Sequence, residues 1–220
     1  MKTRISMMLA ALCVAVSMAA QGAAEMYSKD RKVGPGNKVA MKLYKEAMKK
    51  EKKNPSYSLS VFESLANDGY APAQYRLYEL GKGHEWLEKA ALGGQFAATD
   101  PMFSQLLKQC DLVIDRCRSC VTRASNGGLV SAKEIQMLEE DHWKVLSPAA
   151  EQMIMMMSNL GEAAGARDAN YFPPAYKGKK GIWKAMDEFM ALDRVCHDRL
   201  NGLLDEYNRL MEEIQKYKKK

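Results

Sequence analysis

Cysteines are the residues of this sequence whose type and spacing most directly suggest chemistry. Four of the five lie beyond residue 100, at Cys110, Cys117, Cys120 and Cys196. An even number of cysteines in an oxidising compartment favours structural disulfides, and four cysteines allow three pairings between which a sequence does not choose. Cys117 and Cys120 also form a C-x-x-C pair, the spacing of thiol–disulfide enzymes. The four residues are therefore disulfide candidates first and a redox pair second.

The environment predicted for the C-x-x-C pair favours the structural role. Apolar spacing places Cys117 and Cys120 near the C-terminal end of a helix over 101–124, where the helix dipole raises a thiol pKa. His197 next to Cys196 adds a second type of zinc ligand, but the long separation from Cys120 disfavours a shared metal site. Thiol–disulfide exchange or metal handling at Cys117 and Cys120 is kept as the alternative function.

The other residues that could do chemistry form no enzyme motif. The histidines stand outside any nucleophile, metal or phosphate motif, and the sequence has neither a glycine-rich phosphate loop nor G-x-S-x-G. Clustered methionines can bind Cu(I), but Met153, Met156 and Met157 share one face of a predicted helix, where methionine is a common core residue. We predict no catalytic residue, no metal site and no cofactor.

The N-terminal segment has the three parts of a secretory signal peptide. Lys2 and Arg4 precede an uncharged apolar run over 5–20, and small residues lead to Ala24 before the first acidic residue. We expect residues 1–24 to be removed and the protein to be exported to the periplasm or the exterior. No later stretch reaches about 18 uninterrupted apolar residues, so no membrane span is predicted.

The charge of the chain disfavours nucleic acid as a partner. The formal net charge is +6, and removal of Lys2 and Arg4 leaves +4, which is mild for a protein that binds nucleic acid through a basic face. Lysines gather over 38–53 and at the C-terminus, near the ends of predicted helices, where they complement the helix dipole. Contact with an anionic surface, such as lipid headgroups or a cell-wall polymer, is the alternative for these lysines.

The sequence after a polar lead over 25–37 predicts helices and no strand. Apolar residues recur at spacings of three and four, and alternating β-branched runs are missing. The helices are expected at 38–52, 57–67, 71–80, 84–92, 101–124, 130–145, 148–164 and 180–217. Asp100-Pro101 and Ser147-Pro148 predict helix starts. Glycines predict helix ends at Gly69, Gly81, Gly94 and Gly128. The predicted fold class is all-α.

A short repeat organises these helices. Small residues and glycine recur with the spacing small-x-x-Gly-x-x-x-small, as Ala66-Gly69-Ala73, Ala91-Gly94-Ala98 and Ser125-Gly128-Ala132. The spacing predicts a helix that ends at the glycine turn and a following helix that packs so closely that only a small residue fits between them.

Residues 86–98, with the sequence WLEKAALGGQFAA, resemble the Sel1-like repeat, a helix-pair relative of the tetratricopeptide repeat. The family's pattern is Trp-x-x-Lys-Ala-Ala-x-x-Gly-x-x-x-Ala, and the match is good over about 60–98 and moderate around 117–135. The resemblance implies a short helix-pair solenoid over 38–135 and a protein–protein interaction scaffold without a catalytic site. It also implies packing roles for Ala66, Gly69, Ala73, Leu77, Trp86, Lys89, Ala90, Ala91, Gly94 and Ala98.

The partner implied by the resemblance is another protein, bound on the concave face of the solenoid. Tyr70, Tyr75 and Tyr78 are expected near that face, and tyrosine suits an interface because it combines contact area with a polar tip. Partial burial in the core is the alternative for all three.

Segment 180–220 predicts one long amphipathic helix, which follows irregular helices and a loop over 136–179. Its apolar residues keep a 4-3-4-3 spacing from Ile182 to Tyr217, interrupted only by Asp193. This stripe is typical of a coiled-coil seam. We expect the helix to dock on its own chain as a cap for the repeats, and a homodimer through the same helix is the alternative.

Overall fold

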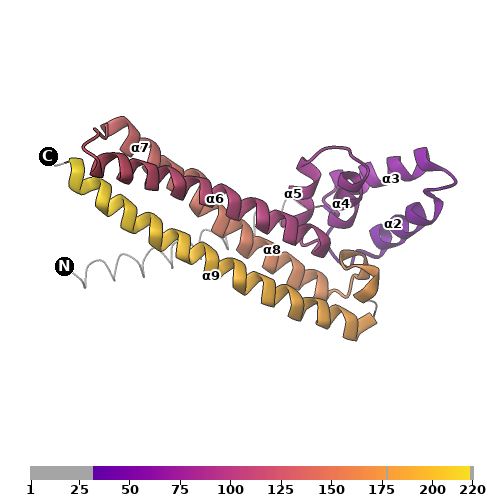
Figure 1. The fold of residues 1–220 in the computed structure, drawn as a ribbon. Coiled ribbons are helices and arrows are strands. Elements are labelled where there is room, and N and C mark those ends of the chain that lie inside the picture. The colour runs from indigo at the N-terminus through magenta and orange to yellow at the C-terminus, as the bar shows by residue number, and fades with distance from the viewer. Residues whose placement is uncertain (1–31, 177, 219–220) are drawn as a thin grey trace. The chain divides into compact units, whose positions relative to one another are not determined.

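A computed structural model gives the structure of residues 32–176 and 178–218 (Figure 1). Within these ranges the secondary structure is helical and contains no strand, so the all-α prediction is confirmed. No helix in the same ranges is long and apolar enough to cross a membrane. The predicted signal peptide lies outside the described residues.

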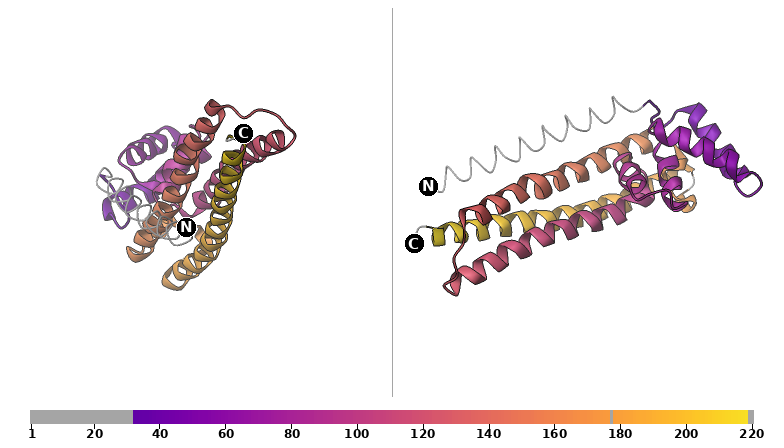
Figure 2. Two further views of the ribbon diagram at one scale, coloured as in Figure 1. Left: turned by 90° about the vertical axis from the view of Figure 1, so that its left-hand side faces the viewer. Right: turned by 90° about the horizontal axis from the view of Figure 1, so that it is seen from above.

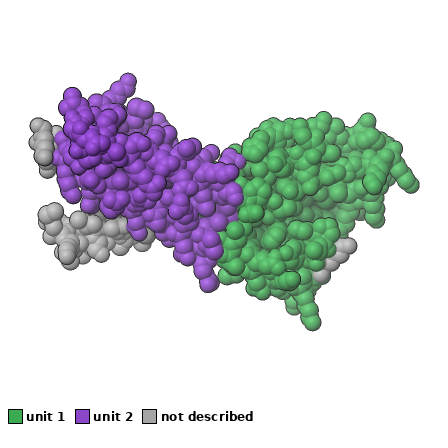
Figure 3. All heavy atoms as spheres, in the orientation of Figure 1, with its two compact units in different colours: residues 1–102, 152–193 green, residues 103–151, 194–220 purple. Residues whose placement is uncertain are grey.

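The chain consists of two compact units (Figure 3). Unit 1 contains the described residues up to Met102 together with Gln152–Asp193, and unit 2 contains Phe103–Glu151 together with Arg194–Lys220. Each unit therefore combines two separate stretches of sequence. The segments expected from the sequence were each continuous along the chain, so this organisation was not predicted.

Unit 1 begins with four short helices, each of which packs against the next. They are α2 (Lys38–Lys50), α3 (Pro55–Asn67), α4 (Ala71–Glu79) and α5 (Glu85–Leu92). Oδ1 of Asn37 caps α2 by accepting hydrogen bonds from the backbone N–H groups of Val39 and Ala40, both at 3.1 Å. Asn54 caps α3, whose first residue is a proline. Local sequence signals therefore set where these two helices begin.

Helices α3 and α5 end in the same kind of turn. Gly69 and Gly94 have φ angles of 93° and 84°, in the left-handed region that glycine enters without strain. In each turn the next residue, Tyr70 or Gln95, donates its backbone N–H at 2.9 Å to a carbonyl in the last turn of the helix. This hydrogen bond belongs to the Schellman pattern, and the helix ends predicted at both glycines are confirmed.

The two other predicted glycine ends have different outcomes. Gly81 has a φ of 70°, as expected for a glycine that ends a helix. After α6 the left-handed residue is Gly127, with a φ of 81°, and the N–H of Gly128 returns to the carbonyl of Arg123 at 2.9 Å. The end predicted at Gly128 is therefore wrong by one residue, because the turn offers two successive glycines.

Both of the helix starts predicted at prolines are wrong. The helices concerned are α6 (Phe96–Ser125), α7 (Ala132–Asp141), the π-helical turn η1 (His142–Leu146) and α8 (Ser147–Gly165). Pro101 is the sixth residue of α6, one turn after its start, and it lacks the N–H that would donate to the carbonyl of Ala97. Pro148 lies in a continuous helical run, because Ser147 is helical and donates its N–H to the carbonyl of His142. The wider π turn relieves the clash of a proline ring with the preceding turn.

The last helix carries the predicted stripe on its buried side. After the 3₁₀ turns η2 (Ala169–Tyr171) and η3 (Pro174–Tyr176), the chain continues as α9 (Gly178–Lys218). Every stripe residue from Ile182 to Ile214 is buried, including Asp193. Burial of the stripe within one chain is what docking predicts, and the homodimer stays an untested alternative.

In unit 2, parts of α6, α7 and α9 contact one another pairwise. Figures 1 and 2 show the end of α9 running beside α6. Polar contacts join each pair of helices: Arg116 with Asp141, Arg199 with Asp111, and the Tyr207 hydroxyl, which donates to the Leu138 carbonyl. The core between the helices contains Ile114, Cys117, Leu203 and Leu210, all of which are buried.

Candidate functional site

The residues to which the resemblance assigns packing roles lie mostly in the interior of unit 1. Gly69 and Trp86 are half-buried, and Lys89 is exposed with its Nζ 4.4 Å from the centre of the Trp86 ring. The remaining residues of the set are buried: Ala66, Ala73, Leu77, Ala90, Ala91, Gly94 and Ala98.

Gly94 shows why a glycine is needed at its position. A Cβ atom there would lie 2.5 Å from the carbonyl carbon of Asn159 and 2.6 Å from the backbone nitrogen of Leu160, both in α8. The Asn159 side chain holds the same contact by donating from Nδ2 to the carbonyl of Leu92, the last residue of α5, at 2.7 Å. The turn after α5 therefore packs directly on the backbone of α8.

Tyr70 does not lie on a binding face, and this part of the tyrosine prediction is wrong. The residue is fully buried, and its hydroxyl donates a hydrogen bond to Oδ2 of Asp168 at 3.0 Å. Its ring makes edge contacts with Tyr44 and Tyr171. Burial raises the pKa of Tyr70, so the hydroxyl stays protonated and acts as a donor. Tyr70 is therefore a core residue, in agreement with the alternative that placed the tyrosines partly in the core.

Asp168 is a buried carboxyl group that the sequence analysis missed. It accepts hydrogen bonds from the Tyr70 hydroxyl and the backbone N–H groups of Gly36 and Asn170. Burial raises its pKa above the ordinary value of 3.8, although these hydrogen bonds act in the opposite direction. The spacing of Asp168 and Asn170, in which the side chain caps a short turn, was the signal that could have found it.

Tyr75 and Tyr78 lie together on α4 and are half-buried. Their ring centroids are 5.9 Å apart, and the ring of Tyr78 makes an edge contact with the imidazole of His84, also at 5.9 Å. Leu80 is 39% exposed beyond the end of the same helix. We call these four residues the aromatic patch. The sequence analysis did not connect His84 with the tyrosines.

A partly buried ion-pair network holds α4, the helix that carries the two tyrosines of the patch. Nη2 of Arg76 lies 2.7 Å from Oε1 of Glu51, at the end of α2, and Nη1 lies 2.7 Å from Oε2 of Glu79. The Arg76 side chain is 24% exposed. Arg76 therefore ties α4 to the preceding helix pair, so the patch stands on a fixed support.

The cysteines are free thiols in the structure, and the predicted disulfides are not supported. All four are buried. Cys110 and Cys117 lie on one helix, where seven residues span about 10.5 Å, too far for a disulfide, which needs Cα atoms within about 7 Å. Burial raises the pKa of Cys117 to about 12 and that of Cys110 to about 11, and it raises the pKa of Cys120 as well. Few thiolates exist at neutral pH, and this does not suit thiol–disulfide exchange.

No group of three His, Cys, Asp or Glu residues in the described part of the chain is arranged to hold a metal ion. The groove of about 300 Å³ beside Cys120 lies between α6 and α7. Its arginines are already paired, Arg116 with Asp141 at 2.7 Å and Arg123 with Glu134 at 2.5 Å. The groove therefore offers a ligand no unpaired charge from these residues.

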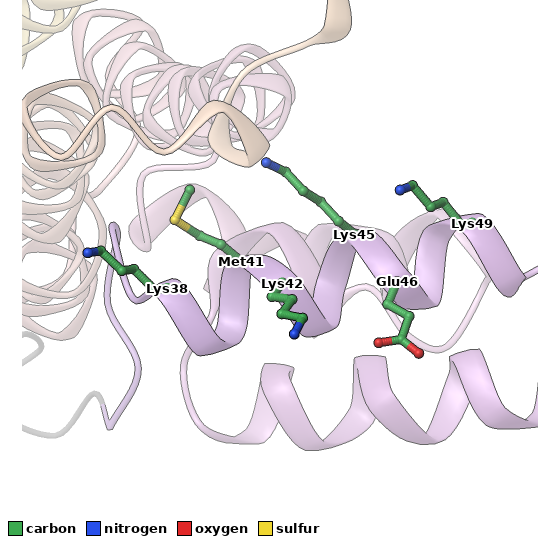
Figure 4. Close-up of a pocket in the computed structure, with 6 residues that line it drawn as sticks. All are labelled: Lys38, Met41, Lys42, Lys45, Glu46 and Lys49. Atoms are coloured by element: carbon green, nitrogen blue, oxygen red, sulfur yellow. The ribbon is translucent and has the colours of Figure 1, made fainter.

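The lysines of α2 form a second surface, shown in Figure 4. Lys38, Lys42, Lys45 and Lys49 are exposed along the helix, and with Met41 and Glu46 they line an open groove of about 490 Å³. This surface and the aromatic patch both belong to unit 1.

No protein-family model, no curated protein and no solved structure matches this chain. The function proposed below therefore rests on the surfaces of the chain itself.

Proposed function

We propose that the protein is a non-catalytic, exported interaction scaffold that binds another protein through the aromatic patch. The observation that carries the proposal is the half-exposed cluster of Tyr75 and Tyr78, on the helix that Arg76 fixes in place, with His84, which directly precedes α5. Tyrosine side chains on rigid supports are frequent anchors of protein interfaces, because they add contact area at a low entropy cost.

The support for a Sel1-like solenoid comes from the first four helices. Consecutive helices pack against one another, and three of them end in the same Schellman turn, at Gly69, Gly81 and Gly94. The small residues that flank the turns at Gly69 and Gly94 are buried, whereas Ser125 and Ala132 of the third copy are exposed, so the close packing predicted for that copy is wrong. In a solenoid of this kind the shared residues build the scaffold and the variable surface binds the partner.

The proposed export depends on the N-terminal sequence. A positive start, an apolar run over 5–20 and small residues before the first acid are the pattern of a cleaved signal peptide. The buried thiols have raised pKa values, so the alternative of a thiol–disulfide or metal-handling protein gains nothing from the geometry at Cys117 and Cys120.

Site-specific cross-linking in the producing cell tests the proposal. A photoreactive p-benzoylphenylalanine replaces Tyr78 in one variant and Tyr217, a half-buried tyrosine of unit 2, in the control. We expect a defined cross-linked protein from position 78 that is absent from position 217. Equal products from both positions, or none from position 78, would contradict a partner at the aromatic patch.

A further inference from the structure

We propose that the exposed face of α2 binds the surface of an anionic phospholipid bilayer. Four lysines, Lys38, Lys42, Lys45 and Lys49, define this surface, which we call the lysine face. The inference does not depend on the proposed protein partner, because it rests on different residues.

The lysine face is continuous along the helix. Spacings of four, three and four residues keep all four side chains on one side of α2 over about 16.5 Å, and each of them is exposed (Figure 4). The buried side of the same helix is formed by Ala40 and Ala47, so the lysines point away from the core.

None of the charges of the lysine face is held in an ion pair within the described part of the chain, although Lys45 interacts electrostatically with Asp168 and Lys42 with Glu46. The one acid between them, Glu46, is paired with Lys50, with Nζ and Oε1 2.6 Å apart. Lys50, Lys52 and Lys53 continue the positive charge beyond the face, so segment 38–53 carries seven lysines against Glu46 and Glu51.

The choice of lysine over arginine indicates a diffuse anionic surface as the partner. Segment 38–53 contains no arginine. Protein interfaces are enriched in arginine and depleted in lysine, because the planar guanidinium binds a carboxylate with two hydrogen bonds. A lysine behaves as a hydrated point charge, which needs no defined geometry in its anionic partner. It therefore suits the diffuse negative charge of a layer of lipid headgroups.

Apolar side chains beside the lysine face favour a bilayer over a soluble polyanion. Val39 is 68% exposed and Leu43 is 37% exposed, one turn apart on one flank of α2, and Met48 is 39% exposed on the opposite flank. A bilayer can receive these side chains at the headgroup boundary while it neutralises the lysines. A soluble polyphosphate neutralises the lysines but leaves the apolar side chains in water.

The test measures partitioning of the protein, as recovered from its host, onto vesicles. Anionic vesicles contain phosphatidylglycerol mixed with phosphatidylcholine, and neutral vesicles contain phosphatidylcholine alone. Measurement of the intact mass shows that every variant has the same N-terminus. The first variant carries Lys38→Gln, Lys42→Gln, Lys45→Gln and Lys49→Gln. The matched control removes four exposed lysines from elsewhere in the described chain: Lys82→Gln, Lys108→Gln, Lys133→Gln and Lys180→Gln. Far-ultraviolet circular dichroism checks that each variant keeps its helices.

We expect the wild type and the control to bind the anionic vesicles and not the neutral ones. Loss of the lysine face should weaken this binding roughly 100-fold or more, since each lysine near a charged bilayer contributes about fivefold. A variant with Val39→Ser and Leu43→Ser should also bind the vesicles more weakly, yet bind polyphosphate like the wild type.

Three results would overturn the proposal. The first is equal binding of anionic vesicles by the lysine-face variant and the control. The second is equal binding of neutral and anionic vesicles by the wild type. The third is unchanged vesicle binding after Val39→Ser and Leu43→Ser, which would make the face a site for soluble polyanions, including acidic protein segments.

Discussion

The Tyr70 hydroxyl donates a hydrogen bond of 3.0 Å to Oδ2 of Asp168, although 98 residues separate them in the sequence. Nδ2 of Asn170 donates to the Tyr70 hydroxyl at 2.7 Å, and the backbone N–H of Gly36 donates to Asp168 at 3.3 Å. Tyr70 directly precedes α4, so this buried network joins the start of that helix to η2 within unit 1. The helix that carries the aromatic patch is thus fixed at its beginning as well as by Arg76.

Replacement of Asp168 by asparagine should change how stability depends on pH. Burial raises the pKa of this carboxyl group above 3.8, so the folded protein binds the proton more tightly than the unfolded chain does. The contribution of the Asp168 carboxyl group to stability is fully present below its pKa in the unfolded chain. This contribution is lost as the pH rises through its pKa in the folded protein. The free energy of unfolding of the wild type, minus that of Asp168→Asn, should therefore fall with rising pH and then become constant.

Urea unfolding at several pH values between acid and neutral measures this difference. Asp198→Asn, at an exposed position of α9, is the control for the loss of a carboxylate. A difference that rises with pH would contradict the prediction, because it would mean that the three hydrogen bonds outweigh burial and lower the pKa of Asp168. A difference that does not vary would mean that the pKa is the same in the folded and unfolded protein.

Replacement of Gly94 by alanine should destabilise the protein more than the same change at Gly127. Both glycines have a left-handed backbone, with φ angles of 84° and 81°, so the backbone strain of an alanine is similar, about 1–2 kcal/mol. A Cβ at Gly94 would meet the α8 backbone at 2.5 Å, whereas nothing lies within 4 Å of one at Gly127. The clash adds about 1–3 kcal/mol at Gly94 alone. Equal losses in denaturant unfolding would contradict the close contact between the turn and α8.

Mass spectrometry after alkylation tests the prediction that the four cysteines form no disulfide. Without reductant, the denatured protein should take up four alkyl groups, at Cys110, Cys117, Cys120 and Cys196, because none of the four forms a disulfide. The folded protein should react slowly at neutral pH, since burial raises the pKa of Cys117 to about 12. A shortfall of two groups would show a disulfide. A fifth group, at Cys13, would show that the proposed signal peptide remains on the chain.

The parts of the fold that could be predicted are those encoded by short-range patterns. The stripe of α9 from Ile182 to Ile214 is buried as its spacing predicts, because an amphipathic helix has one face to bury. The turns at Gly69 and Gly94 followed from the need for a left-handed residue at a helix end. The pairing of Tyr75 with Tyr78 followed from their spacing on one helix.

The parts that could not be predicted depend on contacts between distant segments. Tyr70 is buried because Asp168, far along the chain, supplies a partner for its hydroxyl. Nothing near Tyr70 in the sequence distinguishes it from the tyrosines of α4. The continuous helix through Ser147 and Pro148 depends on a π turn, which local capping signals do not specify. The free cysteines follow from their places on packed helices rather than from their even number.

The most direct test of the proposed scaffold function is the affinity for the protein captured by cross-linking at position 78. Purified partner is titrated against the wild type, a variant with Tyr75→Ala and Tyr78→Ala, and the control Tyr217→Ala, each with its helix content verified. We predict that the double variant binds roughly 10- to 100-fold more weakly, as expected for the loss of two aromatic anchors, while the control binds like the wild type. Equal affinity of the double variant and the wild type would contradict binding through the aromatic patch.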